Sequence, residues 1–147
     1  MQWLMLQQEE PDDFCIATGI QYSVRDFIKF ACQHVGIEIE FKGVGVNEIG
    51  VIKSINHERY ASTVQNSIIN IQDSIGNKII EVDPRYYRPS EVETLLGDAT
   101  KAKDKLGWEP KISFGDMVSE MMKNDISIAK RDMLLKDHGF KAPDFNE

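Results

Sequence analysis

Apolar residues recur at helical spacing in two long stretches of the chain. Between Ser23 and Gly36 they are separated by three or four positions, which is the spacing of one face of a helix. Ser23 can cap the first turn and Gly36 can end the helix. A similar stripe follows Ser113. The pattern predicts helices over residues 24–35 and 114–137, each with one buried face. The first stripe comprises Val24, Phe27, Ile28, Ala31 and Val35.

Three shorter stretches have the composition of strands. Residues 14–18 form an apolar run, which predicts a short buried strand. Residues 37–41 alternate between apolar and acidic side chains, which predicts a half-buried strand, and residues 78–82 predict a third. Glycines at 43, 45 and 50 predict a turn after the second strand. They do not predict a phosphate-binding loop, because GxGxxG and a following helix are both missing.

Other segments carry weaker patterns. Residues 1–8 have helix-forming composition and one apolar side, and they begin without a capping residue, as a helix entered in its middle does. Residues 57–77 fit neither a clean strand nor a clean helix, so we expect a surface insertion there. Residues 141–147 are polar, and we expect a frayed tail.

The loop that follows the third strand presents the chain's candidate binding residues. Two prolines keep it irregular, so its side chains can point outward. Arg88 offers a fixed fork of donors, and Glu91 is an acceptor suited to a vicinal diol such as a ribose. Arg85 and Tyr87 are weaker candidates beside them. The alternative is that Arg88 and Glu91 only pair with each other at the surface, a contact worth about 0–1 kcal/mol.

A compact helix signal comes next. Asp98 can cap a two-turn helix over residues 99–106, and Gly107 can end it, with Trp108 following as a packing residue. From Arg88 to Trp108 the sequence reads RPSEVETLLGDATKAKDKLGW.

This run closely resembles the signature near the C-terminus of GDP-mannose 4,6-dehydratases, which belong to the extended short-chain dehydrogenase/reductase superfamily. The family reads RP-(A/S/T)-EV-(D/E)-x-L-x-GD-x-(T/S)-KA-x-x-x-LGW at this point. The resemblance extends to MQWLMLQQEEPDDFCIATGIQYSVRDF at the start and to SFGDMVSEMMKNDISIAKRDMLLKDHGF near the end. It therefore covers nearly all of residues 1–147, apart from the divergent middle.

The resemblance implies an α/β fold: the C-terminal, mainly GDP-sugar-binding part of a Rossmann-type sugar-nucleotide dehydratase, with most of the Rossmann core missing. It also implies an enzyme that converts GDP-mannose to GDP-4-keto-6-deoxymannose with NADP as hydride carrier. In this family the arginine and glutamate of the RPxEV motif, here Arg88 and Glu91, lie against the ribose of GDP.

The family's catalytic and cofactor motifs do not occur in this sequence. Its dinucleotide turn reads GxxGxxG, and no such spacing of glycines is present. Its catalytic tyrosine is followed four positions later by lysine, which is true of none of the four tyrosines here. We therefore assign no catalytic, cofactor-binding or metal-binding residue, and we expect the chain alone to be inactive.

Composition limits the remaining function classes. The net charge of −7 and the lack of a basic patch argue against nucleic-acid binding. No apolar run approaches the roughly 20 residues that span a bilayer. Two cysteines without a CxxC pair predict neither a disulfide framework nor a zinc site. We expect Cys15 and Cys32 to be buried, reduced thiols of a cytoplasmic protein.

Two alternatives to the dehydratase remain. One is a fragment of a GDP-sugar reductase or epimerase of the same superfamily, which the LLGDATKAKDKLGW run disfavours. The other is a non-catalytic interaction module derived from this fold. Either a homo-oligomer or a complementing N-terminal half would cover apolar surface that the fragment leaves exposed, including part of residues 1–6.

Overall fold

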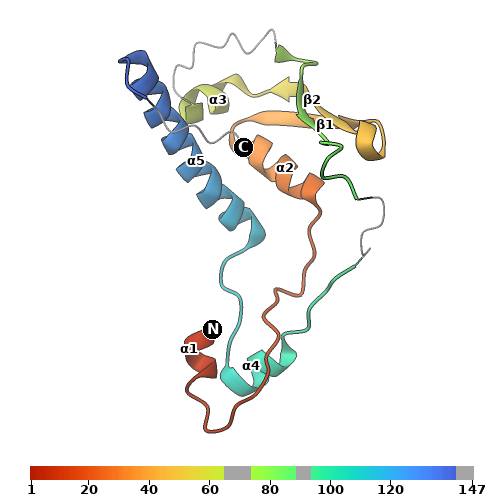
Figure 1. Ribbon diagram of the computed structural model, residues 1–147, viewed down its shortest axis with the longest axis vertical. Coiled ribbons are helices and arrows are strands. Elements are labelled where there is room, and N and C mark those ends of the chain that lie inside the picture. Colours follow the sequence, from red (N-terminus) through yellow and green to blue (C-terminus); the bar gives the residue numbers. More distant parts are fainter. Residues whose placement is uncertain (65–73, 89–93, 142–147) are drawn as a thin grey trace.

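The computed structural model describes residues 1–64, 74–88 and 94–141, and these form an α/β arrangement around a small antiparallel sheet. In Figure 1 the sheet lies at one end of the molecule, whereas helices α1 (Gln2–Met5) and α4 (Thr100–Leu106) lie at the other. Extended segments of chain join the two ends. The α/β class predicted from the sequence is confirmed.

The sheet has the order β1-β2-β3, with β1 (Ile37–Lys42), β2 (Ile49–Ile55) and β3 (Lys78–Glu81) running antiparallel to their neighbours. The alternation that predicted β1 is seen in its burial, because Ile39 is buried between exposed acidic neighbours. The predictions of β1 and β3 are confirmed.

Strand β2 was not predicted, because Gly50 was interpreted as part of a turn. Gly50 instead pairs with Phe41 of β1 and with Ile80 of β3. A methyl group on Gly50 would lie 2.6 Å from Ile39 Cδ1 and 3.0 Å from Ile80 Cβ, so the neighbouring side chains occupy the space of a side chain. The glycine here serves close packing within a strand.

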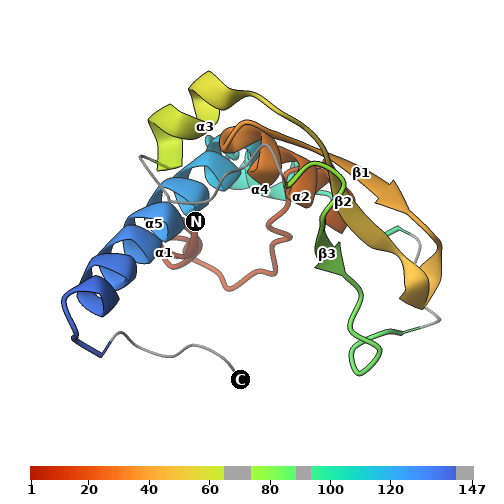
Figure 2. The ribbon, with the colours of Figure 1, turned by 90° about the horizontal axis from the view of Figure 1, so that it is seen from above.

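Helix α2 (Val24–His34) lies against the sheet, and helix α5 (Phe114–Asp137) packs against α2 (Figure 2). The Ser23 hydroxyl accepts a hydrogen bond from the Asp26 amide (3.1 Å), and the Asp26 carboxylate accepts one from the Ser23 amide (2.9 Å), which forms a capping box. Both long helices were predicted correctly.

Aromatic residues join the start of α5 to α2. The ring of Phe114 stacks on Tyr22 at a centroid distance of 3.9 Å and meets Phe27 edge-on at 6.3 Å. Val24 was predicted to belong to the buried stripe, but this first residue of α2 is 75% exposed. Within residues 1–64, 74–88 and 94–141, the buried apolar side chains are those of Ile39, Val51, Ile52, Ala102 and Val118.

Part of the predicted insertion is helical. Helix α3 (His57–Val64) begins where the Asn56 side chain accepts a hydrogen bond from the Arg59 amide (3.0 Å). Lys130 of α5 donates to the carbonyl of Thr63 (2.9 Å), so α3 is held from outside as well. The view that residues 57–77 form no regular helix is therefore wrong for their first part, and residues 65–73 lie outside the described residues.

The N-terminal segment differs most from the sequence-based expectation. Residues 14–18 are extended but pair with no strand among the described residues, and Cys15 is exposed rather than buried. Helix α1 is only four residues long, and Trp3 is 68% exposed. A short helix or strand gains most of its stability from packing, and the described residues supply little of it here.

Two further predictions concern the C-terminal tail and membrane-spanning helices. Of the predicted frayed tail, residues 142–147 lie outside the described residues. Within the described residues, no helix is both long enough and apolar enough to cross a bilayer.

Candidate functional site

The candidate loop leaves β3 through a tight turn. Asp83 occupies its first position and Pro84 its second, as is favoured in turns of this length. The carbonyl of Asp83 accepts a hydrogen bond from the Tyr86 amide (3.1 Å), and its carboxylate accepts one from the Arg85 amide (2.9 Å). The turn is thus fixed by its own residues immediately before Arg88.

Arg85 takes part in this turn. Its guanidinium donates to the Asp83 carboxylate through Nη2 (2.7 Å) and Nε (3.0 Å), and it lies 5.5 Å from the centre of the Tyr86 ring. The hydrogen bonds from Arg85 lower the pKa of Asp83. Arg85 therefore has a role in holding the turn, and its candidacy as a ligand-binding residue is weaker than that of Arg88.

Arg88 is exposed and makes no ion pair among the described residues. The side chain of Tyr87 lies against Gly45, in the turn between β1 and β2, where a methyl group on the glycine would be 3.1 Å from the tyrosine hydroxyl oxygen. Glu91 lies outside the described residues, so its distance from Arg88 is not defined. The ribose-binding role of Arg88, Glu91, Arg85 and Tyr87 stays a prediction.

The turn that receives Tyr87 is tied to helix α2. It contains the 3-10 helix η1 (Gly45–Asn47), which Glu48 follows. Arg25, in the first turn of α2, donates to both carboxylate oxygens of Glu48, at 2.6 Å and 2.8 Å. These hydrogen bonds lower the pKa of Glu48 and raise that of Arg25. The guanidinium of Arg25 is therefore engaged by Glu48.

The signature run continues into helix α4, which has well-defined ends. Asp98 accepts hydrogen bonds from the Thr100 amide (2.9 Å) and hydroxyl (2.5 Å), one position earlier than a regular N-cap. Gly107 adopts a left-handed conformation with φ of 63°, and the Trp108 amide reaches back to the carbonyl of Ala102 (3.3 Å). The predicted end of the helix is confirmed, and its start is shifted by one residue.

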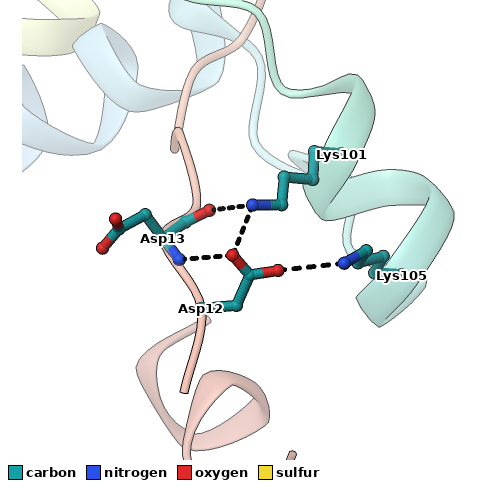
Figure 3. A network of polar contacts seen from close by, with 4 residues as sticks. All are labelled: Asp12, Asp13, Lys101 and Lys105. Atoms are coloured by element: carbon teal, nitrogen blue, oxygen red, sulfur yellow. Dashed lines mark hydrogen bonds and ion pairs between the residues drawn. The ribbon is translucent and has the colours of Figure 1, made fainter. Parts of the chain in front are cut away.

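Two lysines on one face of α4 hold the N-terminal segment. Figure 3 shows Lys101 donating to the Asp12 carboxylate (2.5 Å) and to the Asp13 carbonyl (2.9 Å), with Lys105 on the other Asp12 oxygen (3.0 Å). Hydrogen bonds from Lys101, and then from Lys105, lower the pKa of Asp12 far below its usual range. We refer to these four residues as the Asp12 clamp.

Sequence reasoning missed the ion pairs between residues far apart in the chain, including the two that hold the candidate site and the N-terminal segment. Arg25 and Glu48 are 23 positions apart, and Asp12 and Lys101 are 89 apart. A single sequence contains no signal for such pairs, because each charged residue has many possible partners at the surface. Among the described residues, no group of three or more His, Cys, Asp or Glu side chains is arranged to hold a metal ion.

Comparison with known proteins was made on the whole sequence. The profile of the family described as GDP-mannose 4,6 dehydratase matches residues 1–121. A GDP-mannose 4,6-dehydratase of Vibrio cholerae serotype O1 is 51% identical over 142 residues, which is 97% of this chain and 35% of the relative. The Yersinia enterocolitica enzyme of that name is 50% identical over 140 residues, which is 95% of this chain and 35% of the relative.

A more distant relative is the Homo sapiens GDP-mannose 4,6 dehydratase, which is 39% identical over 128 residues, or 87% of this chain and 29% of the relative. The chain thus spans about a third of the length of the curated relatives it matches. The extent of the profile match, together with the identity to several such proteins over nearly the whole chain, shows that this chain belongs to the GDP-mannose 4,6-dehydratase family.

Proposed function

We propose that this chain forms the GDP-sugar-binding part of a GDP-mannose 4,6-dehydratase, which converts GDP-mannose to GDP-4-keto-6-deoxymannose. The observation that carries the proposal is the similarity to bacterial proteins of that name, at about half of all positions and over nearly all of this chain. The signature run of residues 88–108, which ends in the well-defined helix α4, supports it.

In this proposal Arg88 binds the ribose of GDP-mannose together with Glu91. The geometry around Arg88 supports a contact with ligand: its side chain is exposed, no described residue neutralises it, and the turn before it is fixed by Asp83 and Arg85. A guanidinium can donate to two hydroxyls in one plane, and an ionised carboxylate can accept from the same diol. The role of Glu91 rests on its position in the sequence.

The hydride carrier of the proposed reaction is NADP, and neither the sequence motifs nor the described strands provide a site for it. A dinucleotide is bound where a glycine-rich turn joins a strand of a parallel sheet to a helix. The sequence contains no GxxGxxG turn, and the described strands are antiparallel. We therefore place NADP binding and the chemical steps in the part of the family that lies outside this chain.

The N-terminal segment supports the need for that second part. Residues 14–18 are extended, and their amides and carbonyls make no backbone hydrogen bond to another described segment. Ile16 on this segment is exposed, as are Ile20 just after it and Trp3 and Leu6 earlier in the chain. An exposed apolar segment in extended conformation is a suitable edge for another strand to join. We infer that an N-terminal part of the family covers it.

Complementation tests this proposal. The chain would be coexpressed with the N-terminal part of the Vibrio cholerae relative, and turnover of GDP-mannose would be measured with NADP present. We expect activity from the mixture and none from either part alone. If the two parts copurify but no ratio of them gives product, the proposed reaction is wrong.

Arg88→Ala tests the ligand contact within the same mixture. Loss of a hydrogen bond to a charged group costs about 1–3 kcal/mol, so KM for GDP-mannose should rise by about 5-fold to 150-fold. Arg131→Ala is the matched control, because Arg131 is an exposed arginine of α5 that pairs with its neighbour Asp132. Equal KM values for the two variants would refute the role of Arg88.

A further inference from the structure

We propose that Arg25 and Glu48 act as a positioning pair, which sets the location of the Arg88 loop and thereby the affinity for the nucleotide sugar without contacting it. The proposal rests on the proposed function, because it requires Arg88 to bind that ligand. It assigns a purpose to an ion pair that lies outside the signature run of residues 88–108.

The pair is bidentate, and its carboxylate is partly shielded from solvent. Arg25 uses two nitrogens of its fork on the two oxygens of Glu48, the arrangement that fixes orientation as well as distance. The Glu48 side chain is 16% exposed and that of Arg25 is 58% exposed, so the carboxylate is the shielded partner of the pair. Because the capping box fixes the first turn of α2, Arg25 provides a firm anchor for the backbone at Glu48.

The position of Glu48 is passed on to the loop through two contacts. The first is the turn itself: Glu48 follows η1, its amide bonds the carbonyl of Gly45 (3.1 Å), and Tyr87 lies against that glycine. Gly45 has a φ of +62°, and a methyl group on it would lie 3.1 Å from the Tyr87 hydroxyl oxygen, so the tyrosine approaches the glycine closely.

The second contact is the strand ladder. Ile49, directly after Glu48, pairs with Glu81, the last residue of β3 and the start of the candidate loop. The turn and the loop thus lie at the same end of the sheet, where the gold turn and the green segment are near each other in Figures 1 and 2. A movement of Glu48 would therefore displace both ends of residues 82–87.

Little else among the described residues holds the loop in place. A hollow of about 530 Å³ separates the turn from the loop, and its lining comes from residues 46–49 on one side and 81–84 on the other. Since the two segments do not interdigitate there, the loop depends on the ladder, on the Tyr87 contact and on the anchored turn. Among the described residues, the Arg25–Glu48 pair provides the side-chain hydrogen bonds that join that turn to helix α2.

The competing explanation is that the pair only stabilises the fold. A stabilising pair lowers the melting temperature when it is lost, but it leaves KM of the folded protein unchanged. Loss of a positioning pair raises KM and leaves kcat nearly unchanged, because the ribose contact that it supports contributes equally to the ground state and the transition state. The two explanations therefore predict different values of KM for a variant that lacks the pair.

The test uses the complemented enzyme with three variants, Glu48→Gln, Arg88→Ala and the double variant. We expect Glu48→Gln to raise KM for GDP-mannose by about 3-fold to 10-fold. The double variant should have the same KM as Arg88→Ala, since the effects of residues that act through one another are not additive. Glu38→Gln is the matched control, because it removes a salt bridge to Lys53 at the far end of the same strands.

Each outcome decides a separate point. If Arg88→Ala raises KM and Glu48→Gln does not, the positioning role is overturned while the ribose contact stands. If Arg88→Ala leaves KM unchanged, the ribose contact falls and the positioning role with it. If the two substitutions multiply in the double variant, Glu48 acts independently of Arg88, which also overturns the proposal.

A measurement on the chain alone adds a readout that does not depend on activity. In NMR spectra, Glu48→Gln should shift the ring resonances of Tyr87, whereas Glu38→Gln should leave them in place. Unchanged Tyr87 resonances in folded Glu48→Gln protein would show that the turn does not transmit the loss of the pair.

Discussion

Val118→Ala should destabilise the fold, because Val118 is the buried residue of helix α5. Val118 is 1% exposed and is the largest fully buried side chain among the described residues. It lies on α5, which packs on α2, and α2 carries Arg25. Removing two buried methyl groups costs about 0.8 kcal/mol each in transfer free energy, and the cavity left behind adds to this cost.

A compensating gain reduces the net effect. Alanine is a better helix former than valine by about 0.5 kcal/mol, so the free energy of unfolding should fall by about 1–2.5 kcal/mol. Urea unfolding followed by circular dichroism at 222 nm measures the change. Val24→Ala is the matched control, because the same atoms are removed at a residue of α2 that is 75% exposed. The reasoning is refuted if Val118→Ala costs no more than Val24→Ala.

Three further predictions address the turn between β1 and β2, the Asp12 clamp and His34. Gly43→Ala should cost about 1–3 kcal/mol of unfolding free energy, since its φ is +85° and the added methyl would lie 2.3 Å from a backbone oxygen. Asp12 should titrate by NMR well below the 3.8 of an unperturbed aspartate, because the α4 lysines favour its charged form. Burial and two nearby cations lower the pKa of His34, so unfolding free energy should fall as pH drops below about 6.5.

The controls for these predictions use matched sites and conditions. Gly139→Ala places alanine in a left-handed conformation without a clash, since nothing lies within 4 Å of its added methyl. An equal loss of unfolding free energy at both glycines would refute the clash at Gly43. The Asp12 signal of a Lys101→Met variant should titrate nearer its usual range. His34→Gln should show a smaller stability difference between pH 7.5 and pH 5 than the unaltered chain; an equal difference would place the titrating group elsewhere.

The sign of each pH effect follows from which state binds protons more readily. Asp12 has a lower pKa in the folded chain than in the unfolded chain, so its contribution is present above about 3.8 and is lost as pH falls through the folded value. His34 also has a lower folded pKa, but its favoured form is neutral. The unfolded chain therefore takes up a proton first, and stability declines between the unfolded and folded values.

Local features of this protein were predictable because their causes are local. Ser23 and Asp26 satisfy each other's backbone amides within one turn, and Gly107 supplies the left-handed residue that ends α4. Each of these two helix ends is set by residues close together in the sequence. The alternation that predicted β1 was equally local, and the long stripe after Ser113 predicted α5 for the same reason.

Tertiary structure decided the features that depend on a distant neighbour. Gly50 is typical of a turn in sequence, but the side chains of Ile39 and Ile80 fill the space beside it and make it part of a strand. Residues 14–18 have strand composition, yet no described strand lies beside them to pair with. Side-chain type fixes what a segment can pair with, whereas pairing requires a partner that the fold alone brings within hydrogen-bonding distance.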